Sequence, residues 1–223
     1  MIFTQFQKTD GTGRLLLGGC RADKLAEEYG TPLYVMDEEI IRSACRAYKN
    51  AMDTHCPGGR VSFASKAFCT LAMCRIADQE GLGLDVVSGG EMYTALRAGV
   101  DARKITFHGN AKTDDELRRA VEAGVGSVVI DNDGEILKLE ALGAEMDKTV
   151  GIELRLNPGI EAHTFHAMKT AIEDCKFGLG IGNGRALAAA KKILACPHLK
   201  FIGVHVHIGS QIFETDPFRL AAE

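Results

Sequence analysis

The chain has 223 residues, of which 46% are hydrophobic and 25% are charged, and its formal net charge is −4. This length allows one or two domains with a substantial core. Lysine and arginine are not concentrated in any segment, so nucleic acid is not an expected partner, and no apolar run approaches the roughly 18 residues of a membrane span. The start from Met1 to Arg14 is polar and unlike a signal peptide. Seven scattered cysteines without a Cys-x-x-Cys pair fit reduced thiols and predict a cytoplasmic protein.

The first third of the chain predicts two helices separated by a strand. A short helix is expected over Ala22–Tyr29, closed by Gly30 because glycine readily ends a helix. The apolar segment Pro32–Met36 predicts a strand. Asp37 is expected to cap the next helix, whose body runs to Tyr48.

A regular alternation of strand and helix follows. Six strand-like apolar runs end near Ser65, Val87, Phe107, Ile130, Leu156 and His207. Most successive runs are separated by about two dozen residues, which accommodates one strand, one helix and two short loops. The exception is the longer gap between the last two runs.

The segments between the strands carry helix signals. A serine or threonine followed three residues later by glutamate predicts a capping box, and two such boxes occur: Ser88 with Glu91, and Thr113 with Glu116. The second box is followed by a helix-spaced apolar face: Leu117, Ala120, Val121 and Gly124. Another helix is predicted over Arg185–Ala195, with an inward face formed by Leu187, Ala190, Ile193 and Leu194.

This alternation predicts an α/β fold with a parallel sheet. An open doubly wound sheet lacks support, because no Gly-x-Gly-x-x-Gly follows an early strand. A (β/α)8 barrel is favoured by polar residues that recur at strand ends: Lys66, Asp85, His108, Arg155, His205 and His207. About six of the eight units are present. Thr215–Pro217 would start another helix, so we expect the N-terminal part of a longer protein, the alternative being a complete smaller protein with a frayed end.

Lys66 is the strongest candidate for chemistry. It follows the apolar run Val61–Ser65 and precedes a helical pattern, so it stands at the carboxyl end of a strand, where α/β barrels carry their active sites. In partly dry surroundings its amine can attack a carbonyl group. The alternative is a solvated lysine at a strand end.

The two histidines of His205-x-His207 share one face of their strand, because side chains alternate. They could bind a metal ion together with Asp85 and His108, or they could be polar groups at a barrel rim. The following Gly209–Ser210 favours an anion instead, since a hydroxyl and open backbone amides suit one. His163 and His166, in the long loop from Asn157 to Gly178, could also bind metal, but solvated loop histidines are favoured.

Two charged residues are expected to face the site. Arg155 alternates with apolar residues in its strand and should point into the barrel or its mouth, where it needs an anion or acceptors. Asp85 is placed similarly, although it could instead cap a helix.

The sequence resembles diaminopimelate decarboxylases from about Pro32 to Phe213. The resemblance rests on these segments, in order: Val61–Ala67, Leu84–Glu91, His108–Lys112, Arg155–Gly159, His163–Thr164, Lys176–Gly178 and His205–Gln211. The strings Val-Val-Ser-Gly-Gly-Glu and His-Ile-Gly-Ser-Gln are specific. Ornithine and arginine decarboxylases share the lysine, the aspartate and a His-x-Gly-Ser string, but they usually lack the Asn-Pro-Gly…His-Thr…Lys-Phe-Gly stretch.

The resemblance implies pyridoxal 5'-phosphate bound to a barrel like that of alanine racemase, joined to a β-rich domain. Residues 1–36 would belong to the β-rich domain and residues 37–223 to the incomplete barrel. Lys66 matches the lysine that binds the cofactor covalently, and His207 the histidine lying against its ring. Ser210 matches a phosphate ligand, while Asp85 and Arg155 match polar residues near the cofactor. No metal is implied.

The implied reaction converts meso-2,6-diaminopimelate to L-lysine and carbon dioxide in lysine biosynthesis, in a homodimer. The family's glycine-rich phosphate loop, its acidic partner for the pyridine nitrogen and its substrate-binding residues have no counterpart in these 223 residues, so the chain alone is expected to be inactive. Three alternatives remain: a decarboxylase of another basic amino acid or a related racemase, a non-catalytic barrel that binds pyridoxal phosphate, and a metal-dependent barrel hydrolase.

Overall fold

The computed structural model describes residues 8–159, 177–210 and 212–223. The chain folds into two compact units. The first comprises the residues up to Val61 together with Ile76–Leu82, and the second comprises Ser62–Arg75 together with Gly83–Glu223. These units do not test the predicted domain boundary after residue 36, which stays a prediction.

The first unit begins with a small antiparallel sheet of three strands, β1 (Lys8–Thr9), β2 (Leu15–Leu17) and β3 (Cys20–Arg21). Helix α1 (Ala22–Tyr29) ends at Gly30 with φ 80°, as predicted. Helix α2 (Glu38–His55) is capped by Asp37, whose carboxylate accepts from the backbone N–H groups of Glu39 and Ile40. This cap is also confirmed, but the helix runs past the predicted end at Tyr48.

The predicted strand at Pro32–Met36 is wrong. This segment has no regular secondary structure, and all five of its residues are exposed. A strand needs a neighbour for its backbone N–H and C=O groups. Among the described residues no strand pairs with this segment, so its apolar character alone does not produce a strand.

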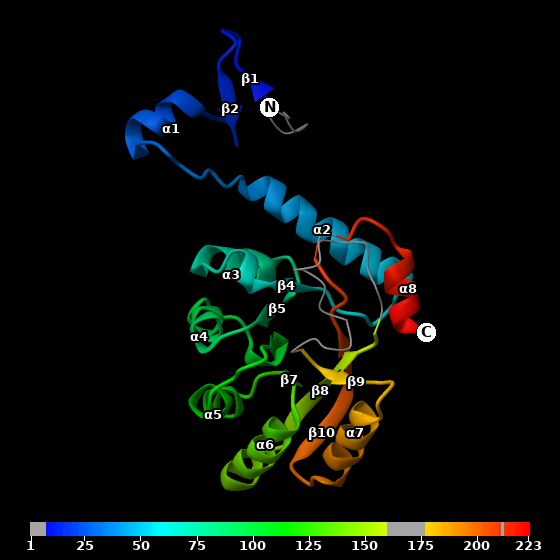
Figure 1. Ribbon diagram of the computed structural model, residues 1–223. Coiled ribbons are helices and arrows are strands. Elements are labelled where there is room, and N and C mark those ends of the chain that lie inside the picture. The colour runs from blue at the N-terminus through cyan, green and yellow to red at the C-terminus, as the bar shows by residue number, and fades with distance from the viewer. Residues whose placement is uncertain (1–7, 160–176, 211) are drawn as a thin grey trace. The chain divides into compact units, whose positions relative to one another are not determined.

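The second unit is built on a parallel sheet (Figure 1). Its neighbouring strands, in order, are β4 (Ser62–Ala64), β5 (Gly83–Val86), β6 (Ile105–Phe107), β7 (Ser127–Ile130), β8 (Val150–Asn157) and β10 (Leu199–Val206). The short strand β9 (Leu179–Gly180) pairs with β8. All six predicted strands are confirmed. Within the described residues the sheet is open, with β4 and β10 at its two edges.

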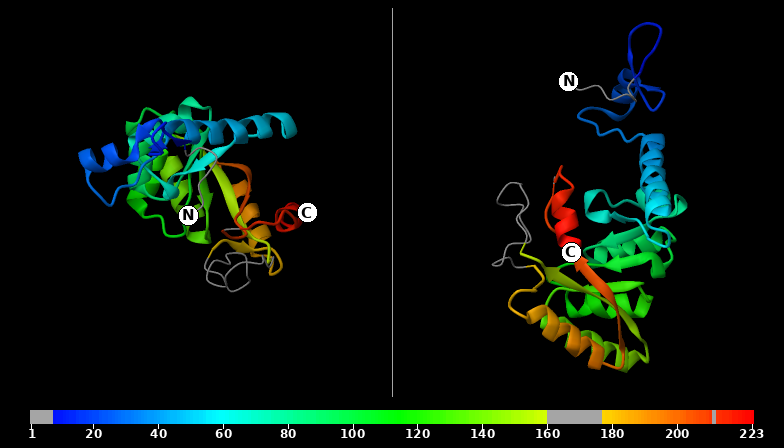
Figure 2. Two further views of the ribbon diagram at one scale, coloured as in Figure 1. Left: turned by 90° about the horizontal axis from the view of Figure 1, so that it is seen from above. Right: turned by 90° about the vertical axis from the view of Figure 1, so that its right-hand side faces the viewer.

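Helices connect the strands: α3 (Leu71–Gln79), α4 (Gly89–Arg97), α5 (Asp114–Ala123), α6 (Asp133–Met146) and α7 (Arg185–Ala195), with 3-10 turns η1 (Ser65–Ala67) and η2 (Ala102–Lys104). Helix α8 (Asp216–Ala222) follows β10. Helices α4 to α7 lie along one face of the sheet (Figures 1 and 2). Among the described residues, none of the helices combines the length and apolarity needed to cross a membrane.

The capping predictions are confirmed in one case and half confirmed in the other. Thr113 and Glu116 form a complete capping box at the start of α5. Ser88 caps α4 by accepting from the Glu91 backbone N–H, but the Glu91 carboxylate accepts from Val87 instead of returning to Ser88. Glu91 therefore fixes the loop that leads from β5 into the helix.

The predicted inward face of α7 is partly wrong. Its bounds are as expected and Ile193 is buried, but Leu187 and Leu194 are 62% and 71% exposed. The buried positions are Ala186 and Ala189. The buried side of α7 is therefore formed by two alanines and Ile193, while Ala190 of the predicted face is half-buried.

The sheet has an apolar face and a polar face. Alternate residues such as Leu84, Phe107, Val128, Ile152 and Leu154 are almost completely buried and form the core beneath the helices. On the opposite face, the Ser127 hydroxyl contacts the Thr106 hydroxyl at 3.1 Å and donates to the Glu153 carboxylate at 2.7 Å. The same alternation places Asp85, His108, Arg155 and His205 on this polar face.

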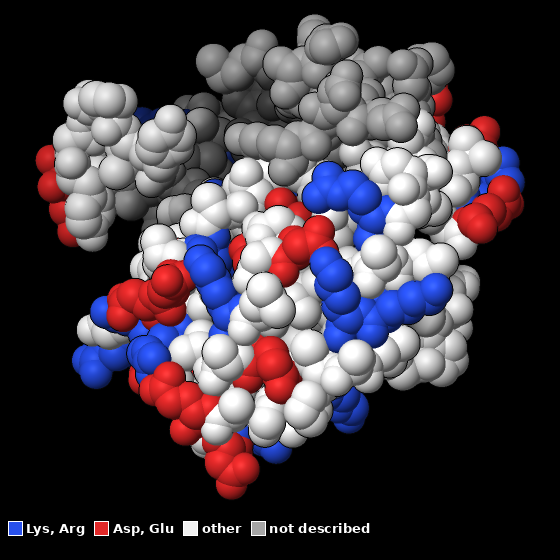
Figure 3. Space-filling model, turned by 60° about the horizontal axis from the view of Figure 1, so that its bottom comes forward, with Lys and Arg blue, Asp and Glu red and all other residues white. Residues whose placement is uncertain are grey.

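The outer surface of the unit carries both signs of charge. Figure 3 shows Lys and Arg interspersed with Asp and Glu on the face that it presents. Pairs such as Arg118–Glu145 at 2.7 Å and Lys192–Asp133 at 2.7 Å link neighbouring helices. Exposed pairs of this kind contribute little to stability.

Candidate active site

A cavity of about 530 Å³ opens at the carboxyl ends of the parallel strands. It lies entirely within the second unit. Its lining residues are Lys66, Val87, His108, Gly109, Asn110, Ala111, Lys112, Glu116, Arg155, Phe177, His207 and Ser210. The volume falls in the range of small-molecule sites.

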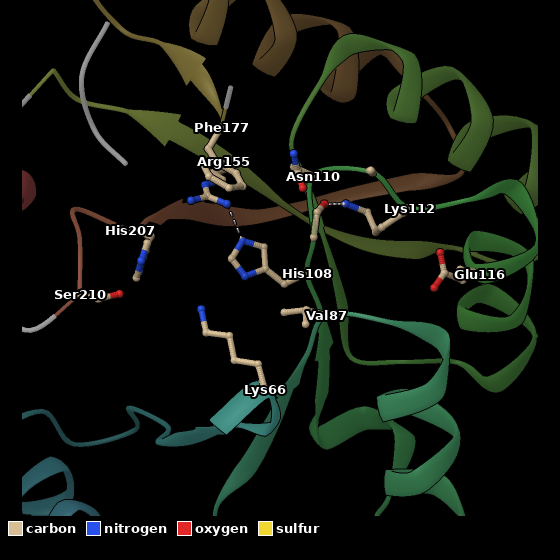
Figure 4. Close-up of a pocket in the computed structure, with 12 residues that line it drawn as sticks. Lys66, Val87, His108, Asn110, Lys112, Glu116, Arg155, Phe177, His207 and Ser210 are labelled. Atoms are coloured by element: carbon tan, nitrogen blue, oxygen red, sulfur yellow. Dashed lines mark hydrogen bonds between the residues drawn. The ribbon is translucent and has the colours of Figure 1, made fainter. Parts of the chain in front are cut away.

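Lys66 reaches the cavity from the turn η1, directly after β4. In Figure 4 its amine points into the space between His108 and the pair formed by His207 and Ser210. The side chain is exposed, so it stands at the open side of the cavity and not in the partly dry surroundings that the sequence suggested. Beside it, Ser65 is buried, and its hydroxyl makes no hydrogen bond among the described residues.

His205 and His207 have different surroundings although they share a face. His207 lines the cavity, whereas the ring of His205 packs edge-on against His108 with 4.3 Å between centroids. Burial lowers the pKa of His205 to about 3, and His108 and Arg155 add to the effect. Burial also lowers the pKa of His207 to about 4, with Lys66 and Arg155 adding to it. Both rings are therefore neutral at pH 7.

Arg155 is almost fully buried at the upper side of the cavity. Its guanidinium lies 3.5 Å from Asp131 Oδ1 and 3.3 Å from His108 Nε2, and it stacks on the Phe177 ring at 4.4 Å from the centroid. These contacts supply the acceptors that a buried arginine needs. Burial raises the pKa of Asp131, although Arg155 and Lys112 oppose that shift.

Asp85 is the candidate residue that does not line the cavity. Its Oδ2 lies 3.7 Å from His108 Nδ1, just behind the lining. Its Oδ1 is buried and makes no hydrogen bond among the described residues. Of the five candidate residues, four line the cavity: Lys66, Arg155, His207 and Ser210.

Sequence reasoning did not single out the buried ion pair that Lys112, in the cavity wall, forms with Glu135. Lys112 Nζ donates to the carbonyls of Gly109 at 2.5 Å and Val129 at 2.8 Å, and it lies 3.0 Å from Glu135 Oε2. The Lys112 and Glu135 side chains are 1% and 4% exposed. Burial lowers the pKa of Lys112 and raises that of Glu135, since desolvation disfavours both charged forms.

Hydrogen bonds to the Glu116 carboxylate connect two of the loops at the cavity. The Glu116 carboxylate accepts from the Gly89 backbone N–H at 2.7 Å and from the Thr113 backbone N–H at 2.9 Å. It therefore holds the loop after β5 against the loop after β6. The helix cap recognised in the sequence thus also positions the rim of the cavity.

The described residues contain no cluster of three or more His, Cys, Asp or Glu side chains arranged to hold a metal ion. The alternative pair in the long loop, His163 and His166, lies outside the described residues, as do Thr164 and Lys176.

The profile described as "Pyridoxal-dependent decarboxylase, pyridoxal binding domain" matches residues 38–223. The chain belongs to the pyridoxal-dependent decarboxylase family. It is 48% identical to the diaminopimelate decarboxylase of Bacillus subtilis over 211 residues, which are 95% of this chain and 48% of that protein. It is 45% identical to the enzyme of the same name from Mycobacterium tuberculosis over 96% of this chain and 47% of that protein. The chain spans about half the length of the curated relatives it matches.

Solved structures confirm the predicted fold class. The diaminopimelate decarboxylase from M. jannaschii in complex with L-lysine matches with a TM-score of 0.86 and 33% identity, covering 96% of this chain and 50% of that one. The Helicobacter pylori enzyme, also with L-lysine, matches with a TM-score of 0.82 and 27% identity over 90% of this chain and 52% of that one. This chain therefore forms part of the α/β barrel of these pyridoxal-binding enzymes, as the sequence predicted.

The cavity fits the cofactor of the family. An amine, a hydroxyl, an imidazole and a guanidinium converge on it from Lys66, Ser210, His207 and Arg155. These groups suit an aldehyde, a phosphate and a flat aromatic ring. The buried Asp85 Oδ1 next to the lining is a further acceptor that makes no hydrogen bond among the described residues.

The lowered histidine pKa values predict a loss of stability in acid. Well above pH 6.5 neither the folded nor the unfolded state binds a proton at the second ring nitrogen of His205, so its contribution is fully present. As the pH falls toward 3, the unfolded state takes up the proton first and stability declines, by at most about 1.4 kcal/mol per pH unit. The His205→Gln variant is expected to show a shallower decline between pH 6.5 and 4, measured by denaturant unfolding.

The quantity to compare is the difference in slope between the wild type and His205→Gln. Burial raises the pKa of Asp131 and Glu135, so the protonation of these two groups stabilises the folded state in acid and opposes the decline in both proteins. His55→Gln, at an exposed position in α2, is the control and should leave the slope unchanged. Equal slopes for the wild type and His205→Gln would contradict the prediction.

Proposed function

We propose that this chain is the cofactor-binding barrel of a diaminopimelate decarboxylase, which releases carbon dioxide from meso-2,6-diaminopimelate and yields L-lysine in lysine biosynthesis. The observation that carries the proposal is the identity of 45 to 48% with such enzymes along almost the whole chain, together with a lysine-lined cavity at the strand ends. The L-lysine bound in two related structures supports this substrate class. An arginine decarboxylase from Paramecium bursaria Chlorella virus is only 19% identical, so that likeness shows the fold alone and does not favour arginine as the substrate.

Bound pyridoxal phosphate supplies the electron sink for the electron pair left by departing carbon dioxide. Lys66 is the amine that would hold the cofactor covalently, and Ser210 would donate to its phosphate. His207 offers a flat neutral ring, so it adds no positive charge beside the cofactor. Arg155 would present a cation to the polar groups of the cofactor, and Asp85, outside the lining, would act from beside His108.

A joined protein tests this function. The 223 residues would be fused to the half of the Bacillus subtilis enzyme that the match leaves uncovered, and carbon dioxide release would be measured with meso-2,6-diaminopimelate, L-ornithine, L-arginine and L-lysine. Release from diaminopimelate above the others is expected. Preference for another amino acid would favour the alternative decarboxylase, and cofactor binding without release would favour the non-catalytic barrel.

The 223 residues by themselves are expected to release no measurable carbon dioxide. The described sheet is open at β4 and β10, and its unpaired strand edges leave the barrel around the polar face incomplete. Turnover equal to that of the joined protein would refute this.

The family's homodimer is part of the proposal, and sedimentation of the joined protein tests it. Cytoplasmic placement is also proposed, since the described cysteines are all free thiols.

His207 is expected to matter more than His205 for activity. His207 lines the cavity, whereas His205 packs behind it on His108. Alanine replacement of each in the joined protein should therefore lower kcat/KM more at His207. A larger loss at His205 would show that the two roles are reversed.

A further inference from the structure

His108 lies where three strands bring their polar side chains together. It follows β6, is 8% exposed, and is the next residue on the polar face after Thr106. Its ring contacts Arg155 from β8, Asp85 from β5 and His205 from β10. Figure 4 shows the ring beneath the guanidinium of Arg155, on the wall of the cavity.

The contact with Arg155 determines which ring nitrogen of His108 carries the hydrogen. A guanidinium has only donors, so the 3.3 Å contact from Arg155 to His108 Nε2 requires that nitrogen to be the acceptor. A neutral ring then carries its hydrogen on Nδ1. That nitrogen faces Asp85 Oδ2 at 3.7 Å, so the ring presents an acceptor to the cation and a donor toward the carboxylate.

The backbone from which this ring extends is held on both sides. The His108 N–H donates to the Val86 carbonyl at 2.7 Å, and the carbonyl of the next residue, Gly109, accepts from Lys112. Gly109 has φ 120°, and a Cβ there would lie 3.2 Å from the Val87 carbonyl, so a side chain would strain this turn. These contacts hold the backbone at His108, and the ring itself is held by its contacts with Arg155 and His205.

Arg155 is oriented between two partners as a result. Asp131 lies on one side at 3.5 Å, His108 on the other at 3.3 Å, and Phe177 covers the guanidinium plane. Replacing His108 would remove the acceptor that Nε2 offers to the guanidinium and the ring that faces Asp85.

We propose that His108 is a positioning residue of this site, which as the neutral Nδ1–H tautomer holds Arg155 and Asp85 in the orientation that receives the cofactor. The inference rests on the proposed function and adds a residue to it. His108 acts through its two neighbours and does not itself react.

Three substitutions separate the parts of this role. Glutamine can place an acceptor near the position of Nε2, asparagine reaches only the position of Nδ1, and phenylalanine keeps the ring packing on His205 but no polar atom. His198→Gln is the control, because His198 pairs with Glu140 away from the cavity. Circular dichroism would establish that each variant is folded.

The first readout is the pyridoxal phosphate concentration that gives half-maximal borohydride labelling of Lys66 in the joined protein. For His108→Phe and His108→Asn we expect an increase of about tenfold or more, the effect of losing one hydrogen bond to a charged group. For His108→Gln and His198→Gln we expect values within about threefold of the wild type, the scale of an ordinary surface change. A purely structural role would give no rescue by glutamine.

The second readout needs no cofactor. Nitrogen NMR of histidine-labelled chain at pH 7, with His108 assigned by its loss in His108→Gln, should show the Nδ1–H tautomer. An Nε2–H tautomer, or normal labelling of Lys66 in His108→Phe, would overturn the inference while leaving the proposed function intact. A joined protein with wild-type His108 that takes no label on Lys66 would instead refute the proposed function, and the positioning role with it.

Discussion

Replacing Lys66 by alanine is expected to abolish the covalent adduct that borohydride fixes between pyridoxal phosphate and this chain. The Lys66 amine points into the cavity and is accessible from its open side. An unprotonated amine is the group that attacks an aldehyde, and alanine has none. Digestion of the reduced protein and mass spectrometry of the peptides would place the adduct, and a peptide containing Lys66 should carry nearly all of it in the wild type.

A second lysine at the cavity allows the labelling experiment to test whether the adduct forms specifically at Lys66. Lys112 also lines the cavity, but its amine is enclosed by the carbonyls of Gly109 and Val129 and by Glu135. These three acceptors match its three hydrogens, so it should not be labelled. Lys66→Arg, which keeps the charge without the reactive amine, should behave like Lys66→Ala, and the exposed Lys200→Ala should label normally. Label spread over surface lysines and unchanged in Lys66→Ala would refute the assignment.

The parallel sheet was predictable because its strands are apolar runs separated by capped helices. The core positions of α5 follow from helical spacing, since Leu117, Ala120 and Val121 are all buried. The errors arise where long-range contacts decide. Pro32–Met36 has strand-like residues but no partner, and α7 packs through Ala186 and Ala189, which a search for large apolar residues overlooks.

The candidate site was predictable in its location and less so in its detail. The rule that barrel strands carry polar residues at their carboxyl ends gathers Lys66, Arg155 and His207 at one cavity. Alternation alone could not distinguish His205 from His207, because it places both on the same face. The position of each along the strand, which the pairing of β10 with β8 fixes, packs His205 against His108 and leaves His207 at the lining.

The supporting ion pair could not be predicted because its members come from separate elements. Lys112 precedes α5 and Glu135 lies in the first turn of α6, and nothing in the spacing of 23 positions shows that they meet. The carboxylate Oε2 also accepts from the Asp131 backbone N–H at 3.0 Å. Together these bonds fasten the loop after β6 to the end of β7, next to Arg155.

Breaking this pair is expected to destabilise the protein strongly. Lys112→Met leaves the Glu135 carboxylate buried beside apolar atoms, and Glu135→Leu leaves the ammonium of Lys112 with its two carbonyl acceptors only. Loss of one partner of a buried ion pair costs about 3–5 kcal/mol, because the remaining charge is uncompensated. Denaturant unfolding followed by circular dichroism would measure the change in the free energy of unfolding.

The double variant Lys112→Met/Glu135→Leu should be clearly more stable than the sum of the single changes predicts. Both charges are gone in the double variant, and apolar side chains of similar size fill the space, so the desolvation cost of the charges disappears together with their attraction. We expect a coupling free energy between the two substitutions of about 1–3 kcal/mol. The matched control is the exposed pair Lys138–Asp114, whose side chains are 49% and 80% exposed. Lys138→Met should change the stability by no more than about 0.5 kcal/mol. Additive effects of Lys112→Met and Glu135→Leu, each as small as the control, would show that the pair does not hold the loop beneath the site.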